Sequence, residues 1–278
     1  MSSSFGADAY SLKTIRVEVA KGVAWAIFEN PPINLVDEAM KKDLVQFLDQ
    51  VADDDAVRVI VFESADPDFF LAHLDVTGGA STPSNPPFSV AIAQRLARLP
   101  KVSIAKIAGR ARGAGSEIAL ACDMRFASLE RAILGQPEVA VGLFPGGGGI
   151  QRLPRLIGRG RSLEVILGAD DFPASVAERY GWVNRALPDA ELDLFVDQLA
   201  CRIASFPAEA LATAKKLVDK ISLPDDAVLA AENRLFWQAM ANPEARRRLQ
   251  RMLEDGLQTR GRVEKNLGWA IAGSGGDR

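Results

Sequence analysis

Apolar and polar positions alternate along the first of two short segments near the start of the chain. The first segment, Ile15–Ala20, reads IRVEVA, and the second, Val23–Phe28, follows it after Lys21-Gly22. Alternation with a period of two is typical of a strand, and a short connection containing glycine is typical of a tight turn. The sequence therefore predicts a β-hairpin over residues 15–28.

The spacing of apolar residues then changes to that of a helix. The paired prolines in ENPPINLVD, residues 29–37, exclude a strand interior and predict an extended loop. Asp37 can cap the helix that follows, on which the apolar residues share one face. These residues are Met40, Leu44, Phe47, Leu48 and Val51.

Strands and helices continue to alternate as far as about residue 187. The segment GGASTPSNPP, residues 78–87, is rich in glycine, serine and proline and predicts a mobile surface loop. Helices are expected over residues 88–99 and from about Ile150. Strands are expected over residues 57–62, 102–108, 123–128 and 132–134. Such alternation indicates an α/β fold.

From Asp189 onward the pattern is helical throughout, and pairs that contain proline divide the helices. These pairs are Phe206-Pro207, Leu223-Pro224 and Asn242-Pro243. Asn242, Pro243 and Glu244 fit the cap, first position and first turn of one helix. We therefore expect an α/β core over residues 1–188 and a helical region over residues 189–278.

Composition narrows the function classes. With a net charge of −3 and 25 % charged residues, the chain has no basic excess that would favour nucleic acid. No apolar run approaches the roughly 20 residues that span a bilayer. The first residues lack a secretory pattern, so a cytoplasmic location is expected. Two cysteines and the single histidine, His73, provide no metal-binding cluster, and we expect no metal site.

The run IAKIAGRARGAGSEIALACDMRF, residues 104–126, carries the first candidate chemistry. An apolar strand leads through a glycine loop into a helix, and backbone N–H groups at a helix start suit an oxyanion. Glu117 lies in this apolar helix, where burial would raise its pKa and suit it to proton transfer. Glu117 could equally accept bonds from backbone N–H groups or pair with Arg125, so from the residues alone both readings stay open.

Glu138 is the second candidate carboxylate. It follows Pro137, precedes the apolar VAVGLF and lies 21 residues after Glu117. Two carboxylates near one cleft can divide the roles of acid and base. An exposed glutamate at the end of a loop is the plainer alternative, and the sequence alone does not show that Glu117 and Glu138 meet. His73, taken alone, is more typical of an ordinary loop residue than of a catalyst.

Four motifs together resemble the crotonase superfamily, the enoyl-CoA hydratase and isomerase family. They are NPPIN (30–34), FFLAHLD (69–75), GRARGAGSEIALACDMRFAS (109–128) and LGQPEVAVGLFPGGGGIQRLPRLIG (134–158). The resemblance implies a spiral of ββα units with a C-terminal helical region. It also implies that this region covers the active site and supports a homotrimer or a dimer of trimers.

The resemblance further implies an acyl-CoA thioester as substrate, with coenzyme A as part of that substrate and no separate cofactor. By motif position, Glu117 and Glu138 would be catalytic, and the backbone N–H groups of Leu74 and Ala114 would hold the thioester oxygen as an enolate forms. The substrate-binding positions would be Ala72, His73, Asp75 and Gly113. Retention of both glutamates favours hydration of a 2-enoyl-CoA to a 3-hydroxyacyl-CoA.

The chain departs from the family pattern at three positions. His73 stands where a glycine is usual, Ala114 where glycine is frequent, and Thr77 where a basic residue is frequent. Two alternatives therefore accompany the hydratase prediction. One is isomerisation, or hydrolysis of a carbon–carbon bond in a diketone, with His73 as a participant. The other is a non-catalytic acyl-CoA binder on the same fold.

Overall fold

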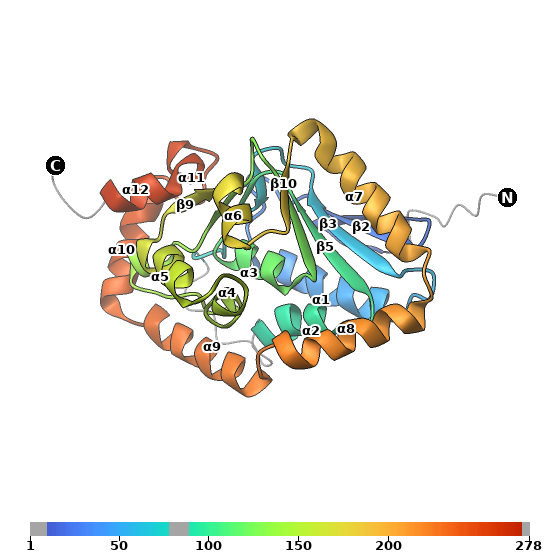
Figure 1. Ribbon diagram of the computed structural model, residues 1–278. Coiled ribbons are helices and arrows are strands. Elements are labelled where there is room, and N and C mark those ends of the chain that lie inside the picture. The colour runs from blue at the N-terminus through green and yellow to red at the C-terminus, as the bar shows by residue number, and fades with distance from the viewer. Residues whose placement is uncertain (1–9, 78–88, 274–278) are drawn as a thin grey trace.

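The computed structural model describes residues 10–77 and 89–273 (Figure 1). The loop predicted over residues 78–87 and the start of the chain, residues 1–9, lie outside the described residues. Strands β1 (Ile15–Ala20) and β2 (Val23–Phe28) pair antiparallel, with Ile15 opposite Phe28. Lys21 and Gly22 have φ of 53° and 79°, as a two-residue hairpin turn of this hand requires. The predicted hairpin is confirmed.

Two sheets share the remaining strands. The larger sheet has the order β1-β2-β3-β5-β7-β10 and the smaller has the order β4-β6-β8-β9. The other strands of the larger sheet are β3 (Val59–Ser64), β5 (Val102–Ile107), β7 (Met124–Ser128) and β10 (Arg185–Leu187). Those of the smaller sheet are β4 (Phe69–Leu71), β6 (Arg110–Arg112), β8 (Ile133–Gly135) and β9 (Asp171–Pro173).

The chain contributes its strands to the two sheets in turn. In the pairs β3/β4, β5/β6 and β7/β8, the first strand joins the larger sheet and the second joins the smaller. Within each sheet, a strand of one pair runs parallel to the corresponding strand of the next pair. Each pair therefore adds one turn to a spiral of the chain. This is the spiral of ββα units that the family resemblance implied, and the predicted α/β fold is confirmed.

The larger sheet is covered on both faces, as its nearly continuous apolar strands require. Along β3, Ile60 and Phe62 join one buried cluster with α1 (Glu38–Ala52) and α3 (Ala114–Ala121). Val59 and Val61 point the other way and pack in a second cluster with α7 (Asp189–Ala204). Complete burial of each such side chain is worth roughly 1.5–3 kcal/mol.

Helices follow the predicted pattern closely. Asp37 caps α1 by accepting a hydrogen bond from the N–H of Met40 at 2.8 Å, and Asn242 caps α10 through Glu244 N–H, also at 2.8 Å. From Asp189, every described element is a helix. After α7 these are α8 (Ala208–Ser222), α9 (Asp226–Met240), α10 (Pro243–Glu254), α11 (Arg262–Lys265) and α12 (Leu267–Gly273). In Figure 1 the last of them, α12, returns beside β9 of the smaller sheet.

Some predicted boundaries differ from the structure. The strand expected to begin at Val57 begins at Val59, because the N–H of Val57 donates to the Asp54 carbonyl in the turn that follows α1. The helix expected over residues 88–99 is a wider π-helical turn, Ser89–Gln94, followed by α2 (Arg95–Arg98). The helix expected from about Ile150 is α4 (Gly149–Ile157), followed by α5 (Arg159–Gly168) and α6 (Ala174–Tyr180).

Candidate active site

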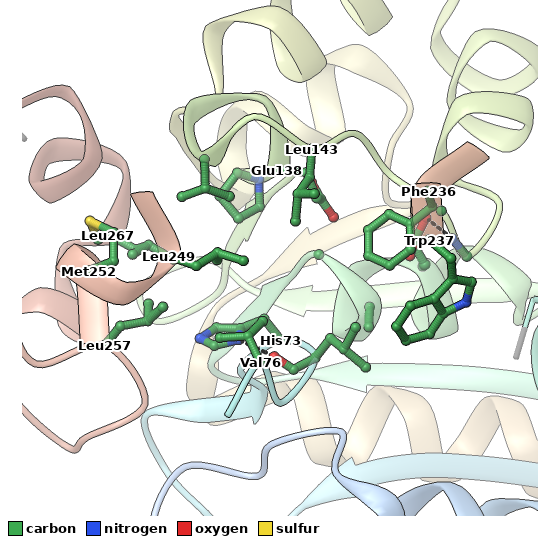
Figure 2. A pocket seen from close by; sticks show the side chains of 18 of the residues that line it. His73, Val76, Glu138, Leu143, Phe236, Trp237, Leu249, Met252, Leu257 and Leu267 are labelled. Atoms are coloured by element: carbon green, nitrogen blue, oxygen red, sulfur yellow. Dashed lines mark hydrogen bonds between the residues drawn. The ribbon is translucent and has the colours of Figure 1, made fainter. Parts of the chain in front are cut away.

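A cavity of about 170 Å³ lies where the glycine loop, the segment around Glu138 and the C-terminal helices meet. Its polar lining includes His73, Glu117 and Glu138. The apolar lining comes mainly from the C-terminal region. Figure 2 shows Leu249, Met252, Leu257 and Leu267 on one side and Phe236 and Trp237 on the other, with Glu138 and His73 between them.

Two glycines position the helix that carries Glu117. Gly113 precedes α3 with φ of 47°, a conformation that other residues rarely adopt. At Gly115, a Cβ atom would lie 2.2 Å from the Leu71 carbonyl oxygen, so only glycine lets α3 pack this closely on β4. Glu117 is thereby fixed one turn into α3, at the cavity wall.

Glu117 is buried, and its Oε1 accepts hydrogen bonds from the N–H groups of Gly147 at 2.7 Å and Gly149 at 2.9 Å. Burial raises the pKa of Glu117, and these two N–H groups with the charge of Arg152 offset only part of that rise. The proposed pairing with Arg125 is wrong, since the guanidinium of Arg125 donates to backbone carbonyls instead. Glu117 therefore accepts hydrogen bonds from backbone N–H groups and also faces the cavity.

Glu138 begins a 3₁₀ turn, Glu138–Val141, and faces the same cavity. The side-chain amide of Gln136, oriented with its NH2 group toward Glu138, donates to both carboxyl oxygens of Glu138 at 3.1 Å. Burial, followed by the charge of Glu117, holds the pKa of Glu138 well above its ordinary value. A Cβ atom on Gly113 would lie 3.0 Å from Oε1 of Glu138, so any larger residue at position 113 would crowd this carboxyl group. The two glutamates meet in one cavity.

The two predicted oxyanion donors also line the cavity, and within the described residues both have a free N–H. Ala114 is the first residue of α3, and no described residue accepts a hydrogen bond from its N–H or from that of Leu74. The carbonyl of His73 accepts from the N–H of Val36 at 2.9 Å. Because a trans peptide directs C=O and N–H to opposite sides, the Leu74 N–H points away from Val36.

The structure separates the four residues predicted to bind substrate. His73 and Gly113 line the cavity, whereas Ala72 and Asp75 are not among the residues that line it. Ala72 is fully buried against Ile33 and Phe69. Asp75 accepts hydrogen bonds from the Thr77 N–H and from the side chain of Gln258. These two positions support the loop instead of facing the cavity.

The sequence pattern did not predict that the C-terminal helices form an apolar wall of the cavity. The three consecutive apolar residues Leu235, Phe236 and Trp237 are a signal in the sequence, and Phe236 and Trp237 line the cavity. On α10, the i, i+3 spacing of Leu249 and Met252 places both side chains in that wall. Which apolar face of a helix meets a cavity depends on how the helices return to the core, and local spacing does not give that.

Among residues 10–77 and 89–273, no three His, Cys, Asp or Glu side chains gather as metal ligands would. No helix in that part of the chain has both the length and the apolar character needed to cross a membrane.

Comparisons with known proteins show which proteins this chain is similar to. The chain is 30% identical to the short-chain-enoyl-CoA hydratase of Clostridium acetobutylicum over 240 residues, which cover 84% of this chain and 92% of that protein. It is 35% identical to the fatty acid oxidation complex subunit alpha of Vibrio parahaemolyticus over 181 residues. That match covers 62% of this chain but only 26% of the Vibrio subunit.

A solved structure and a family profile complete the comparison. The structure, from Streptomyces avermitilis, carries the provisional name enoyl-CoA hydratase and is 46% identical, with a TM-score of 0.88. The match covers 94% of this chain and 97% of that one. The profile described as enoyl-CoA hydratase/isomerase matches residues 18–259. The chain therefore belongs to the enoyl-CoA hydratase/isomerase family.

Proposed function

We propose that this protein adds water to a 2-enoyl-CoA thioester to give a 3-hydroxyacyl-CoA. The observation that carries the proposal is one apolar cavity lined by two carboxyl groups with raised pKa and by two free backbone N–H groups. Carboxyl groups tuned in this way exchange protons near neutral pH, and free N–H groups stabilise a developing oxyanion. Coenzyme A enters as part of the substrate.

The proposed reaction assigns a task to each group. Glu117 accepts a proton from water as the water oxygen bonds to the β-carbon of the substrate. The electron pair of the double bond moves toward the thioester oxygen, which the N–H groups of Leu74 and Ala114 bind as an enolate. Glu138, protonated because its pKa is raised, then delivers a proton to the α-carbon. Return of the proton from Glu117 to Glu138 restores the starting state, and the sum of these steps is then addition of one water molecule to the substrate.

Hydrolysis of a carbon–carbon bond with His73 as a base is less well supported. Nδ1 of His73 lies 2.8 Å from the Leu74 carbonyl, and Nε2 lies 2.7 Å from a carboxylate oxygen of Glu264. Both partners are acceptors, so both ring nitrogens carry protons and the ring has no free base. Retention of Glu117 also favours hydration over isomerisation.

Hydration of crotonyl-CoA and longer 2-enoyl-CoA thioesters tests the proposal directly. We expect Glu138→Gln and Glu117→Gln each to lower kcat by about 100-fold or more, since general acid–base catalysis contributes roughly 10²–10⁴-fold. Loss of the absorbance of the double bond conjugated with the thioester carbonyl measures the rate. Glu244→Gln, at an exposed position on α10, is the matched control and should keep the parental rate. Equal rates in the parent and in Glu138→Gln would refute the assigned role.

The resemblance also leads us to propose that the chain assembles as a homotrimer or a pair of trimers. Support comes from α8, whose residues are all at least partly exposed although the helix carries an apolar row. Leu217, Val218 and Ile221 are 57%, 61% and 89% exposed. An apolar surface of this kind is typical of a contact with another protein chain.

A further inference from the structure

His73 connects the cavity to the C-terminal part of the chain. Its ring lies in the cavity wall, directly before Leu74, and its Nε2 donates to Oε1 of Glu264 at 2.7 Å. Glu264 comes from α11, 191 residues further along the chain, and is completely buried. The contact therefore joins the predicted oxyanion donor to a helix that does not line the cavity.

The hydrogen-bond partners define the charge of His73. A carbonyl oxygen can only accept, so Nδ1 carries the proton that it donates to Leu74. Oε1 of Glu264 also accepts from the N–H of Gln258 at 2.7 Å, as a carboxylate does. With both nitrogens donating, the ring is an imidazolium.

These contacts fix both peptide groups that flank the Cα atom of Leu74. The peptide before it is held through the His73 carbonyl, which accepts from Val36 N–H at 2.9 Å. The peptide after it is held at both ends. Its carbonyl accepts from the His73 ring at 2.8 Å, and its N–H, from Asp75, donates to the Val36 carbonyl at 3.2 Å. Of the polar groups of these two peptides, the Leu74 N–H has no acceptor in the described part of the chain, and it is next to the cavity.

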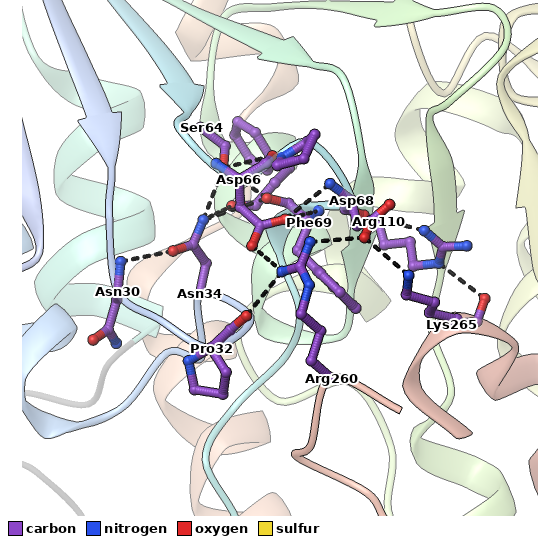
Figure 3. A network of polar contacts seen from close by, with 12 residues as sticks. Asn30, Pro32, Asn34, Ser64, Asp66, Asp68, Phe69, Arg110, Arg260 and Lys265 are labelled. Atoms are coloured by element: carbon purple, nitrogen blue, oxygen red, sulfur yellow. Dashed lines mark hydrogen bonds and ion pairs between the residues drawn. The ribbon is translucent and has the colours of Figure 1, made fainter. Parts of the chain in front are cut away.

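Residues 258–265, the strap, hold His73 and the next part of the loop from outside. Gln258 accepts from the Val76 N–H at 3.0 Å and donates to the Asp75 carboxylate at 2.7 Å. Figure 3 shows the other anchor of the strap, where Arg260 and Lys265 bind Asp66 and Asp68 on the core. The strap is thus attached to the core independently of its contact with His73.

We propose that His73, held as an imidazolium by Glu264, is a positioning residue that fixes the Leu74 peptide so that its free N–H binds the thioester oxygen. The proposal deepens the proposed function and rests on it, since the oxygen in question is that of an acyl-CoA.

The energetics argue against a purely stabilising role for the pair. A buried ion pair is weak evidence for stability, because the loss of hydration of both charges offsets much of their attraction. Oε2 of Glu264 has no hydrogen-bond partner among the described residues, and a buried polar atom left in this state lowers the stability of the folded protein. Because the His73–Glu264 pair contributes little to stability, its contact with the Leu74 peptide is the better explanation for it.

The charged groups around His73 sustain the imidazolium. Glu264 on α11 is its direct partner, and Arg112 on β6 lies close but is paired with Asp171 on β9 at 2.6 Å. Glu117 and Glu138 face it across the cavity. Burial lowers the pKa of His73, but Glu264 and the Leu74 carbonyl outweigh burial and leave the pKa raised. In Glu264→Gln we therefore expect the ring to lose a proton at a lower pH.

The first test reads the ring directly. His73 is the only histidine in the sequence, so a tag-free protein labelled with ¹⁵N-histidine gives one pair of ring-nitrogen signals. We expect both nitrogens to be protonated at pH 7.5 in the parent and one of them to be deprotonated in Glu264→Gln. A neutral ring in the parent at pH 6–8 would overturn the proposal.

The second test measures ligand binding at the oxyanion site without turnover. Acetoacetyl-CoA can bind as an enolate, whereas butyryl-CoA cannot. We expect Glu264→Gln and His73→Ala to weaken the binding of acetoacetyl-CoA about tenfold more than that of butyryl-CoA. His73→Asn, which keeps a donor near the Leu74 carbonyl, should recover part of the loss. Equal weakening of both ligands, or none, would overturn the proposal.

Asp123→Asn is the matched control for binding. It removes the partner of Lys215, a largely buried cation 2.8 Å from Asp123 and outside the cavity lining. It should lower the melting temperature and leave the ratio of the two affinities unchanged. If the parent prefers the enolate but hydrates no enoyl-CoA, the hydratase assignment fails and the positioning role stands. If it hydrates enoyl-CoA and Glu264→Gln behaves as the parent, the positioning role fails alone.

Discussion

Glu138 illustrates at the scale of one residue how a catalytic environment opposes stability. Burial and the charge of Glu117 raise its pKa well above the ordinary value, so the folded protein keeps this proton to a higher pH than the unfolded chain does. Between the two pKa values the folded state binds more protons, and stability therefore falls as pH rises. Glu138 therefore lowers the free energy of unfolding in the pH range in which the proposed reaction needs this residue.

Replacing Glu138 with glutamine should remove this cost. We expect Glu138→Gln to melt at a higher temperature than the parent at pH 8, because the glutamine amide stays neutral and has no proton whose loss would destabilise the folded state. Near pH 4 the carboxyl is largely protonated in both states, so the difference should vanish. Thermal melts from pH 4 to 8 measure it, and a shift that does not change with pH would contradict the explanation.

The residues of the candidate site differ in how far sequence could reveal them. Glu117 and Glu138 stand in specific motifs, and the structure brings both to one cavity. Glu264 stands in no motif that we could identify, and its contact with His73 spans 191 residues. A charge in a short polar helix looks exposed in sequence, and only the return of the chain onto the core buries it.

At the scale of elements, the packing of α3 on β4 depends on the absence of one side chain. We expect Gly115→Ala to lower the free energy of unfolding by at least about 2 kcal/mol, because the new Cβ would lie 2.2 Å from the Leu71 carbonyl oxygen. Urea titration measures the change. Gly160→Ala is the control within α5, where nothing lies within 4 Å of the new atom, and it should raise stability by up to about 1 kcal/mol. Similar effects at both sites would contradict the packing argument.

Periodicity predicted the long elements and missed the short ones. β1 alternates over six residues and β2 is apolar over six residues, and the bounds of both match the prediction. β6 has three residues, and two of them are arginines. Arg112 is nonetheless 1% exposed, because Asp171 from β9 binds its guanidinium. A strand whose buried position is filled by a paired charge gives no apolar signal, so the smaller sheet could not be derived from pattern alone.

At the scale of the whole molecule, the outward face of α8 makes the proposed assembly testable. Ile221 is 89% exposed, with Leu217 and Val218 beside it on the same face of the helix. In a trimer this row would be buried, and a charge placed there would lose its hydration without a partner. We therefore expect Ile221→Glu to shift the molar mass in solution from a multiple of 29.9 kDa toward one chain. Light scattering coupled to gel filtration measures that mass.

A matched substitution separates the apolar row from a general effect of charge on α8. Lys216 lies on the opposite side of the helix from Ile221, so Lys216→Glu should leave the mass unchanged. Far-ultraviolet circular dichroism should report parental helix content in both variants, because no residue of α8 is buried within the chain. If Ile221→Glu keeps the parental mass, α8 is not the contact. If the parent is itself a single chain, the exposed row of α8 needs another partner.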